Sequence, residues 1–506
     1  MQRTALSMIT LGLDSGTQST KCIALDLDSG KIVASASHAY GLIEGLPAGH
    51  LEQNPQTWLD AVDKTVRACI QQLGKKKDRV RAIGVSGQQH GFVPLNKKNE
   101  VIRPAKLWCD TSTADQCKQF ESEFGGVEEL IKLAGNSIPP GFTAPKILWL
   151  KQNEPKNFKA LHTVLLPHDY INFYLTGEKG MEFGDASGTG LLDVRTKQWC
   201  RPLLEFIDEG LEECLPPLAS SRRAIGLLTD SLREAWGLSK SPVVSAGGGD
   251  NMMGAIGTGN VRPGVVTASL GTSGTLYAFA AEPVVDSEGE VAAFCDSTDR
   301  WMPLVCTMNV TVATEQVRKM FNWSHEELEK HVLETPAGAG GLVFLPYLNG
   351  ERTPNLPQGT GIFHGLTTET MEPGYMARAV MEGVTLGLAY GLNRFRQHGI
   401  EPTEIRLTGG GSKSAVWRQI CADIFSVPTV CLQSAEGAAL GAALQAAYAC
   451  AAAEGEPTRF LVLAEKYVAL DEKTRCQPHN SRRETYARLL TRQSDLTTRL
   501  HTAGYL

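Results

Sequence analysis

One short loop pattern occurs twice in the chain, and in both copies glycine and hydroxyl residues separate two β-type runs. The copies are Leu13-Asp14-Ser15-Gly16-Thr17-Gln18-Ser19-Thr20-Lys21 and Ser269-Leu270-Gly271-Thr272-Ser273-Gly274-Thr275. Glycine lets the main chain approach a ligand closely, so such turns offer N–H groups and hydroxyls to an anion. The duplication predicts a phosphate chain held from both sides of a cleft between two related domains. Only the first copy carries a carboxylate, Asp14, which indicates the magnesium side.

Length, composition and charge set the class of protein. A chain of 506 residues is too long for one core, and we expect two domains, at 1–254 and 255–506. With 42% hydrophobic and 21% charged residues the composition is typical of globular proteins. A net charge of -6 gives no electrostatic reason to expect a nucleic-acid partner.

The sequence likewise predicts no membrane association and a cytoplasmic location. No apolar stretch approaches the roughly 18 residues of a membrane span, and the N-terminal residues do not resemble a signal peptide. The 12 cysteines are scattered without any C-x-x-C pair. Such cysteines are typical of reduced thiols in a cytoplasmic protein.

Hydrophobic periodicity predicts an α/β protein. Residues 8–40 read as a β-meander, Asn54-Pro55 opens a helix that Gly74 closes, and Val80–Val85 is a strand. In the second half, strands at 265–270 and 405–408 and a helix near 377–396 continue the alternation. The run Ala438–Ala453 is small and apolar on nearly every side, which predicts a helix packed between a sheet and other helices.

Phosphate binding cannot rest on the common nucleotide motifs. The chain has neither G-x-x-x-x-G-K-[ST] nor a G-x-G-x-x-G turn after a strand. We therefore assign it to the two hairpin loops and to Gly409-Gly410-Gly411-Ser412-Lys413-Ser414, which joins a strand to a helix. Alone, the three glycines would be read as a tight turn; beside two phosphate loops they favour a surface for a nucleotide base.

Asp250 is the strongest catalytic candidate. It follows three glycines at a strand end, where carboxylates of α/β enzymes commonly meet the substrate. A carboxylate there can accept a hydroxyl proton as phosphoryl transfer begins. The alternative is a helix N-cap, since helix-like sequence follows.

Three further pairs of polar residues admit both a functional and a structural interpretation. Gln89 and His90 follow a strand, and adjacent amide and imidazole groups suit the hydroxyls of a polyol, although a polar turn is the alternative. Asp110 and Asp185 are expected to be structural. Glu351 and Arg352 are expected to pair with each other in a loop.

Taken together and in this order, these motifs resemble the FGGY family of carbohydrate kinases. Asp14–Lys21 resembles the first phosphate loop of that family. Gly141-Phe142-Thr143-Ala144-Pro145-Lys146-Ile147-Leu148-Trp149-Leu150 resembles the first family signature, and Gly361-Ile362-Phe363-His364-Gly365-Leu366 opens the second. The chain departs from the second signature at Tyr375, where the family usually has a polar residue. The resemblance extends from about residue 9 to residue 490.

The resemblance implies a fold and a set of site residues. The fold is α/β, with two ribonuclease H-like domains, as in actin and hexokinase, flanking a deep cleft. Asp250 matches the catalytic base, Asn251 a neighbouring sugar contact, Gln89 and His90 the sugar site, and Asp14 the carboxylate near Mg²⁺. The remaining matches lie on the ATP side: Thr17, Gln18, Ser19, Lys21, Gly271 and Thr272 at the phosphates, and Gly410, Gly411 and Ser414 at the adenosine.

The implied activity is transfer of the γ-phosphoryl group of ATP to a small sugar, with Mg²⁺ as cofactor. The Asn-Gln-Arg-Glu run of glycerol kinases is replaced by Gly87-Gln88-Gln89-His90, which favours a ketose, D-xylulose, phosphorylated at its 5-hydroxyl. Other acceptors remain open: a ribulose, a six-carbon ketose or an alditol. A non-catalytic, actin-like ATP-binding scaffold is the alternative from another class. A homodimer is expected only from the family.

Overall fold

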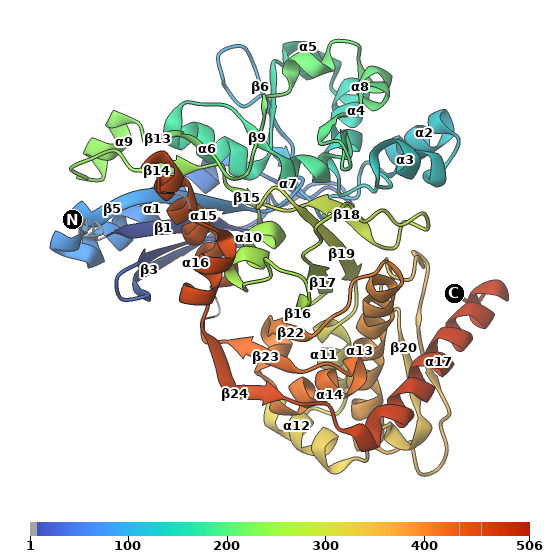
Figure 1. The fold of residues 1–506 in the computed structure, drawn as a ribbon. Coiled ribbons are helices and arrows are strands. Elements are labelled where there is room, and N and C mark those ends of the chain that lie inside the picture. Colours follow the sequence, from blue (N-terminus) through green and yellow to red (C-terminus); the bar gives the residue numbers. More distant parts are fainter. Residues whose placement is uncertain (1–7, 435, 457) are drawn as a thin grey trace.

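The computed structural model describes residues 8–434, 436–456 and 458–506. Each half of the chain builds one seven-stranded sheet, and the two sheets form the upper and lower parts of the molecule in Figure 1. The first sheet has the order β13-β14-β5-β1-β2-β3, with β15 beside β5. Its strands are β1 (Ile9–Ser15), β2 (Ser19–Asp26), β3 (Lys31–Ala39), β5 (Val80–Gly87), β13 (Ala224–Leu227), β14 (Val243–Ser245) and β15 (Gly248–Gly249).

The second sheet repeats the arrangement of the first. Its order is β18-β19-β17-β16-β22-β23-β24. The strands are β16 (Val265–Leu270), β17 (Gly274–Ala278), β18 (Ala292–Cys295), β19 (Trp301–Thr307), β22 (Glu404–Thr408), β23 (Thr429–Leu432) and β24 (Leu470–Cys476). In both sheets a hairpin (β1–β2, β16–β17) is extended by a strand parallel to its first member (β5, β22). The duplicated loops are therefore equivalent hairpin turns, and the predicted duplication is confirmed.

The first long helix forms as its sequence predicts. Helix α1 (Pro55–Leu73) starts with proline, whose missing N–H costs nothing in the first turn. The Asn54 side chain accepts a hydrogen bond of 3.0 Å from the Gln56 N–H, and Gly74 ends the helix. Its apolar face packs on β2 and β3.

Helix α15 (Gly437–Ala453) comes from the second half of the chain but packs on β1, β5 and β14 of the first sheet. In Figure 1 it lies, near the red end of the colour scale, beside the blue strands. Its other main neighbour is α10 (Asp250–Gly257). A Cβ on Gly12 would lie 1.9 Å from the Ala439 carbonyl oxygen, and one on Gly441 would lie 1.8 Å from that of Met253. The contact thus needs residues without side chains, and the predicted packing between sheet and helix is confirmed.

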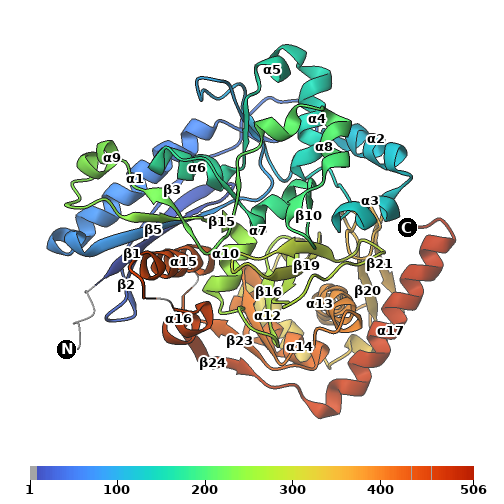
Figure 2. The same ribbon diagram turned by 45° about the horizontal axis from the view of Figure 1, so that its top comes forward.

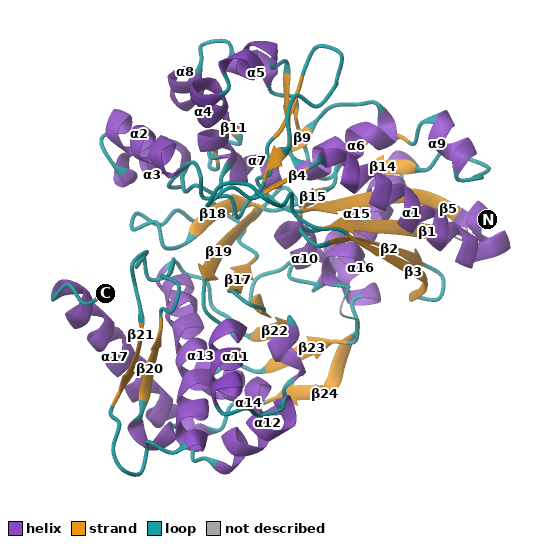
Figure 3. Ribbon diagram, turned by 180° about the vertical axis from the view of Figure 1, so that it is seen from behind, coloured by secondary structure: helices purple, strands orange, loops and turns teal. Residues whose placement is uncertain are grey.

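Most of the other helices lie on the outer parts of the two halves, whereas the short α7 (Phe183–Ala186) lies near the centre (Figures 2 and 3). The first half carries α2 (Ala114–Phe124), α3 (Val127–Ala134), α4 (Thr143–Asn153), α5 (Pro155–Ala160), α6 (Pro167–Thr176), α7 (Phe183–Ala186), α8 (Arg201–Ile207) and α9 (Asp230–Ala235). All of these helices lie in the part of the chain between β5 and β14. The short strands β6 (Val93–Leu95) and β8 (Thr163–Leu165) pair within it.

In the second half, helices surround the long α13 (Pro373–Gln397), which packs against β17, β19 and the hairpin of β20 (Val343–Pro346) and β21 (Gly361–His364). Helix α17 (Asn480–Thr502) packs against α13 and α14 (Ala415–Phe425). The remaining helices of this half are α11 (Thr311–Met320), α12 (His325–Glu334) and α16 (Phe460–Tyr467). Across the described ranges, no helix is both long and apolar enough to span a membrane.

Candidate active site

The carboxyl ends of three neighbouring strands bring the first candidates together. Asp14 on β1 pairs in register with Ser86 on β5, and Ser86 in turn pairs with Gly248 on β15. The Ser86 hydroxyl donates a hydrogen bond of 2.8 Å to Asp14 Oδ1. Burial raises the pKa of the Asp14 carboxyl, and this hydrogen bond opposes the rise. Strand ends at one edge of an α/β sheet are where ligands usually bind.

Asp250 lies directly after β15, at the first position of α10. Gly249 is the N-cap of that helix, so the alternative interpretation of Asp250 as the N-cap is wrong. Asp250 Oδ1 accepts a hydrogen bond of 2.8 Å from the Asn251 N–H. Burial, with repulsion from Asp14 and Asp185, raises the Asp250 pKa to about 7. A carboxylate with this pKa is well matched to accept a proton near neutral pH.

The Gln89 and Asn251 side chains meet beside Asp250. The Asn251 amide donates a hydrogen bond of 2.6 Å to Gln89 Oε1, which orients the Gln89 amide. Gln89 Nε2 is buried and has no hydrogen-bond partner among the described residues. Buried polar atoms are nearly always partnered in native proteins, so such an open donor indicates a place for a polar ligand.

His90 packs against two aromatic rings that also contact each other. Its ring centroid lies 4.8 Å from that of Phe142 and 5.7 Å from that of Phe294. Gly188 makes room for it, because a Cβ there would lie 2.2 Å from His90 Nδ1. Burial, with the positive charges of Lys146 and Arg352 nearby, keeps the His90 pKa well below its usual value. The imidazole is thus neutral and can both donate and accept a hydrogen bond.

Sequence reasoning gave no role to Trp108, which is hydrogen-bonded to the first phosphate loop. Its indole Nε1 donates a hydrogen bond of 3.0 Å to Thr17 Oγ1, and 38% of the residue is exposed. Thr17 Oγ1 itself donates to Gln88 Oε1, at 3.1 Å. An exposed indole next to polar groups is suited to contact the apolar face of a sugar. The signal for a role of Trp108 in sugar binding is its large exposed aromatic surface, which only the structure reveals.

Asp185 belongs to a buried chain of charged groups near the candidate base Asp250. It accepts a hydrogen bond of 2.8 Å from His168 Nδ1, and His168 Nε2 lies 2.9 Å from Asp169 Oδ1. The two carboxylates raise the His168 pKa well above its usual value although burial opposes this, so the imidazole is charged. The partners of Asp185 match the structural role expected from the sequence, while its charge contributes to the raised pKa of Asp250.

The predicted first phosphate loop is the turn of the β1–β2 hairpin. The Gly16 N–H donates to the Ser19 carbonyl oxygen at 3.0 Å, and Gln18 is exposed at the tip. Lys21, predicted to contact ATP, forms an ion pair of 2.6 Å with Glu436, just before α15. The first loop is therefore tied to the second half of the chain through this pair.

The second loop and the glycine run lie together beside a pocket of about 610 Å³. Thr311, at the start of α11, donates its N–H to the Gly271 carbonyl oxygen at 2.9 Å and also lines the pocket. The Val310 N–H donates to the Thr272 carbonyl oxygen at 3.0 Å. The pocket is further lined by Gly410, Gly411, Lys413, Ser414, Trp417, Thr314, Glu315, His325, Leu328, Glu329 and Met381. All three residues predicted for the adenosine side line this pocket.

The expected pairing of Glu351 with the Arg352 guanidinium is wrong. The buried Glu351 carboxylate accepts hydrogen bonds from the backbone N–H groups of Met308 (2.6 Å) and Arg352 (2.9 Å) and from the Asn309 amide (3.3 Å). Buried backbone donors require acceptors, and these outcompete the exposed guanidinium. Burial raises the pKa of Glu351 to about 7. Glu351 thus anchors the segment that continues into Val310 and Thr311, next to the second phosphate loop.

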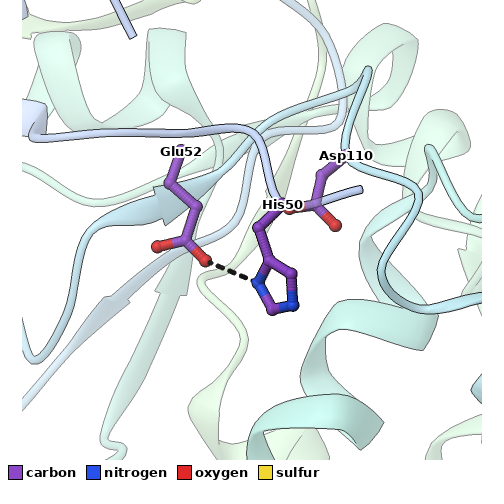
Figure 4. A group of neighbouring side chains, drawn as sticks. All are labelled: His50, Glu52 and Asp110. Atoms are coloured by element: carbon purple, nitrogen blue, oxygen red, sulfur yellow. Dashed lines mark ion pairs between the residues drawn. The ribbon is translucent and has the colours of Figure 1, made fainter. Parts of the chain in front are cut away.

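Figure 4 shows a group with the composition of a metal site, His50, Glu52 and Asp110, whose donor atoms lie within 4.8 Å of one another. The ammonium of buried Lys106 already occupies it. Lys106 Nζ lies 3.2 Å from His50 Nδ1, 3.1 Å from Glu52 Oε1 and 3.2 Å from Asp110 Oδ2. A lysine therefore takes the place of a cation here. Asp110, which also accepts from the Leu51 N–H, is structural as expected.

Comparison with known proteins decides the family. Residues 9–257 match the N-terminal domain of the FGGY family of carbohydrate kinases, and residues 266–450 match its C-terminal domain. The chain belongs to the FGGY family of carbohydrate kinases. The resemblance seen in the sequence is confirmed, and this FGGY chain is a phosphotransferase of a family that uses ATP.

Relatives and solved structures agree with this assignment over almost the whole chain. A xylulose kinase of Haemophilus influenzae is 40% identical, and the match covers 96% of this chain and 99% of the relative. The crystal structure of a "xyloylose kinase" from Brucella ovis superposes with a TM-score of 0.91 at 31% identity, covering 98% and 100% of the two chains. A gluconate kinase from Lactobacillus acidophilus gives 0.90 at 26% identity, with 98% of both chains covered. The two-domain, actin- and hexokinase-like FGGY fold is therefore confirmed.

Proposed function

We propose that the protein transfers the γ-phosphoryl group of ATP to the 5-hydroxyl of D-xylulose, giving D-xylulose 5-phosphate and ADP. The observation that carries the proposal is Asp250, whose pKa is raised to about 7 beside the open amide of Gln89. Such a base next to unpaired polar atoms suits a hydroxylated acceptor. The relatives named xylulose kinase support D-xylulose as that acceptor.

In the proposed reaction Asp250 takes the proton of the 5-hydroxyl as its oxygen attacks the γ-phosphorus in line. Gln89, His90 and Asn251 hold the other hydroxyls of the sugar and orient the attacking oxygen. Correct alignment of the two substrates supplies most of the rate enhancement, because little covalent chemistry is asked of the protein.

The two hairpin loops are proposed to bind the phosphates. Thr17, Gln18, Ser19 and Lys21 approach them from the first half of the chain, and Gly271 and Thr272 from the second. For Lys21 to contact ATP, its ion pair with Glu436 must open or be shared. Gly410, Gly411 and Ser414 line the pocket of about 610 Å³ that we assign to the adenosine.

The residues around Asp14 fit Mg²⁺. Asp14 and Asp250 both carry carboxylates, and the negative charge of Asp14 raises the pKa of Asp250. A cation near Asp14 would offset this repulsion between the two carboxylates. Oxygen donors are the ligands that Mg²⁺ prefers, usually with several waters retained. When bound, Mg²⁺ neutralises charge on the phosphate oxygens. Asp14 would hold it, directly or through water.

Location and assembly are part of the proposal. All 12 cysteines are free thiols, which supports a reducing cytoplasmic location, where ATP is also available. The family expectation of a homodimer stays a prediction, as do the domain limits at 254 and 255.

A sugar panel tests the function most broadly. ADP release is measured with the purified enzyme and Mg-ATP on D-xylulose, D-ribulose, L-ribulose and glycerol. We expect D-xylulose to give the highest kcat/KM. A better substrate elsewhere in the panel would reassign the acceptor within the family. ATP hydrolysis that no sugar stimulates would instead favour the actin-like scaffold.

A further inference from the structure

Lys146 on α4 has a fully buried ammonium group. Its Nζ donates hydrogen bonds to the backbone carbonyl oxygens of His90, at 2.8 Å, and Gly141, at 2.6 Å. Within the described part of the chain no carboxylate lies within ion-pair distance of this nitrogen. Burial lowers the Lys146 pKa to about 7. A lysine is rarely buried without a carboxylate partner, because its desolvation is costly.

The first carbonyl belongs to a residue in an unusual conformation. His90 has a φ of 61°, in the left-handed region that residues other than glycine rarely adopt. Such a conformation persists only where the surroundings hold it. Its carbonyl oxygen accepts from Lys146 Nζ and, at 3.1 Å, from Thr143 Oγ1. Two side chains of α4 therefore fix this one peptide group.

The second carbonyl belongs to the turn that positions the ring partner of His90. Gly141 precedes Phe142, whose ring lies 4.8 Å from that of His90. The Lys146 ammonium group thus holds the main chain next to the His90 ring and next to the Phe142 ring. Gly188 lies against the buried His90 Nδ1. The His90 imidazole is consequently constrained through its backbone and by the packing of its ring against Phe142 and Gly188.

We propose that Lys146 is a positioning residue that sets the affinity for the acceptor sugar by holding His90 in its left-handed conformation. Lys146 need not touch the sugar; it acts through the His90 carbonyl. The inference deepens the proposed function and rests on it for the assignment of His90 to the sugar site.

The central test compares Lys146→Met with Lys151→Met. Lys151 lies on the same helix and also donates to a backbone carbonyl oxygen, that of Ile207, and to Asp208, away from the site. D-xylulose binding is measured by titration calorimetry, and KM for each substrate by ADP release. We expect Lys146→Met to raise Kd and KM for the sugar about ten- to a hundredfold, the range for a lost charge-assisted hydrogen bond, and KM for ATP less than about twofold. Lys151→Met should leave these constants within about twofold.

A double-mutant cycle with His90→Ala separates positioning from general damage. If Lys146 acts through His90, Lys146→Met should have little further effect on sugar binding once the imidazole is gone. Additive effects, or equal losses toward sugar and ATP, would overturn the inference. If Lys146→Met does not fold, Thr143→Val removes the other donor to the same carbonyl. It should raise the sugar Kd a few-fold, and only when His90 is present; no rise would count against the proposal.

The proposed function and the positioning role of Lys146 can be contradicted separately. D-xylulose binding without phosphorylation would contradict the proposed function and leave the role of Lys146 measurable by calorimetry. Phosphorylation with a sugar affinity that ignores Lys146 would contradict only the positioning role. Absence of any D-xylulose binding to the unmodified enzyme would contradict both.

Discussion

The Asn251 amide donates a hydrogen bond of 2.6 Å to Gln89 Oε1 and thereby ties the start of α10 to the segment that follows β5. This contact leaves Gln89 Nε2 as an open donor beside Asp250. We therefore expect Asn251→Ala to raise KM for the sugar about tenfold or more and KM for ATP less than about twofold, because the Gln89 amide loses its orientation and a sugar contact is removed.

Asn157→Ala is the matched control for that variant. Asn157 makes an equally short amide hydrogen bond, 2.6 Å to Glu154, away from the site. Steady-state kinetics with each substrate varied in turn should show no more than a twofold change. A normal sugar KM in Asn251→Ala would remove Asn251 and the oriented Gln89 amide from the sugar site.

The raised pKa of Asp250 predicts an acidic limb in the pH profile. The group accepts a proton only as a carboxylate, and its pKa is raised to about 7, so lowering the pH below 7 protonates it. We expect kcat/KM for the sugar to fall about tenfold per pH unit below that value and to level off above it. Asp14→Asn should shift the limb to lower pH, because one neighbouring negative charge is removed. A flat profile between pH 5 and 8 would contradict the assignment.

Gly410 offers a test of the nucleotide pocket that spares the fold. A Cβ at this position would meet no atom within 4 Å, and its φ does not require glycine, although the residue lines the pocket. Gly410→Val should therefore change the melting temperature little and raise KM for ATP about tenfold or more by steric exclusion of the base. KM for the sugar serves as the internal control. Unchanged ATP kinetics would place the adenosine elsewhere.

Two glycines in helices should respond oppositely to substitution by alanine, because only Gly441 lies in the close contact between α10 and α15. Gly441→Ala would place its Cβ 1.8 Å from the Met253 carbonyl oxygen and should destabilise the protein by about 2–4 kcal/mol, as severe overpacking does. Gly387→Ala in α13 would meet only Pro346 Cγ, at 3.8 Å, and should stabilise by up to about 1 kcal/mol through helix propensity. Denaturant unfolding measures both. Equal stabilities would show that the close helix contact is absent in solution.

Local patterns in the sequence predicted the elements, while long-range contacts decided the site. The hairpin loops, α1 and the small-residue helix α15 were predictable because periodicity, caps and turns are local signals. The packing of α15 on the first sheet was not, because nothing local distinguishes one sheet from another. The contributions of Trp108 and Lys146 to the site were missed for the same reason. Trp108 contacts Thr17, 91 residues away along the chain, and Lys146 contacts His90, 56 residues away. The Glu351–Arg352 pair failed because backbone N–H groups of other segments claim the carboxylate.

The most direct measurement of the central claim is sugar-dependent ADP release by Asp250→Ala. Its melting temperature and its ATP affinity are recorded beside it, with Asn157→Ala as the control variant. If Asp250 is the base, turnover on D-xylulose falls roughly a hundredfold or more while folding and ATP binding are retained, the scale of a lost general base. Near-normal turnover by Asp250→Ala would contradict the account.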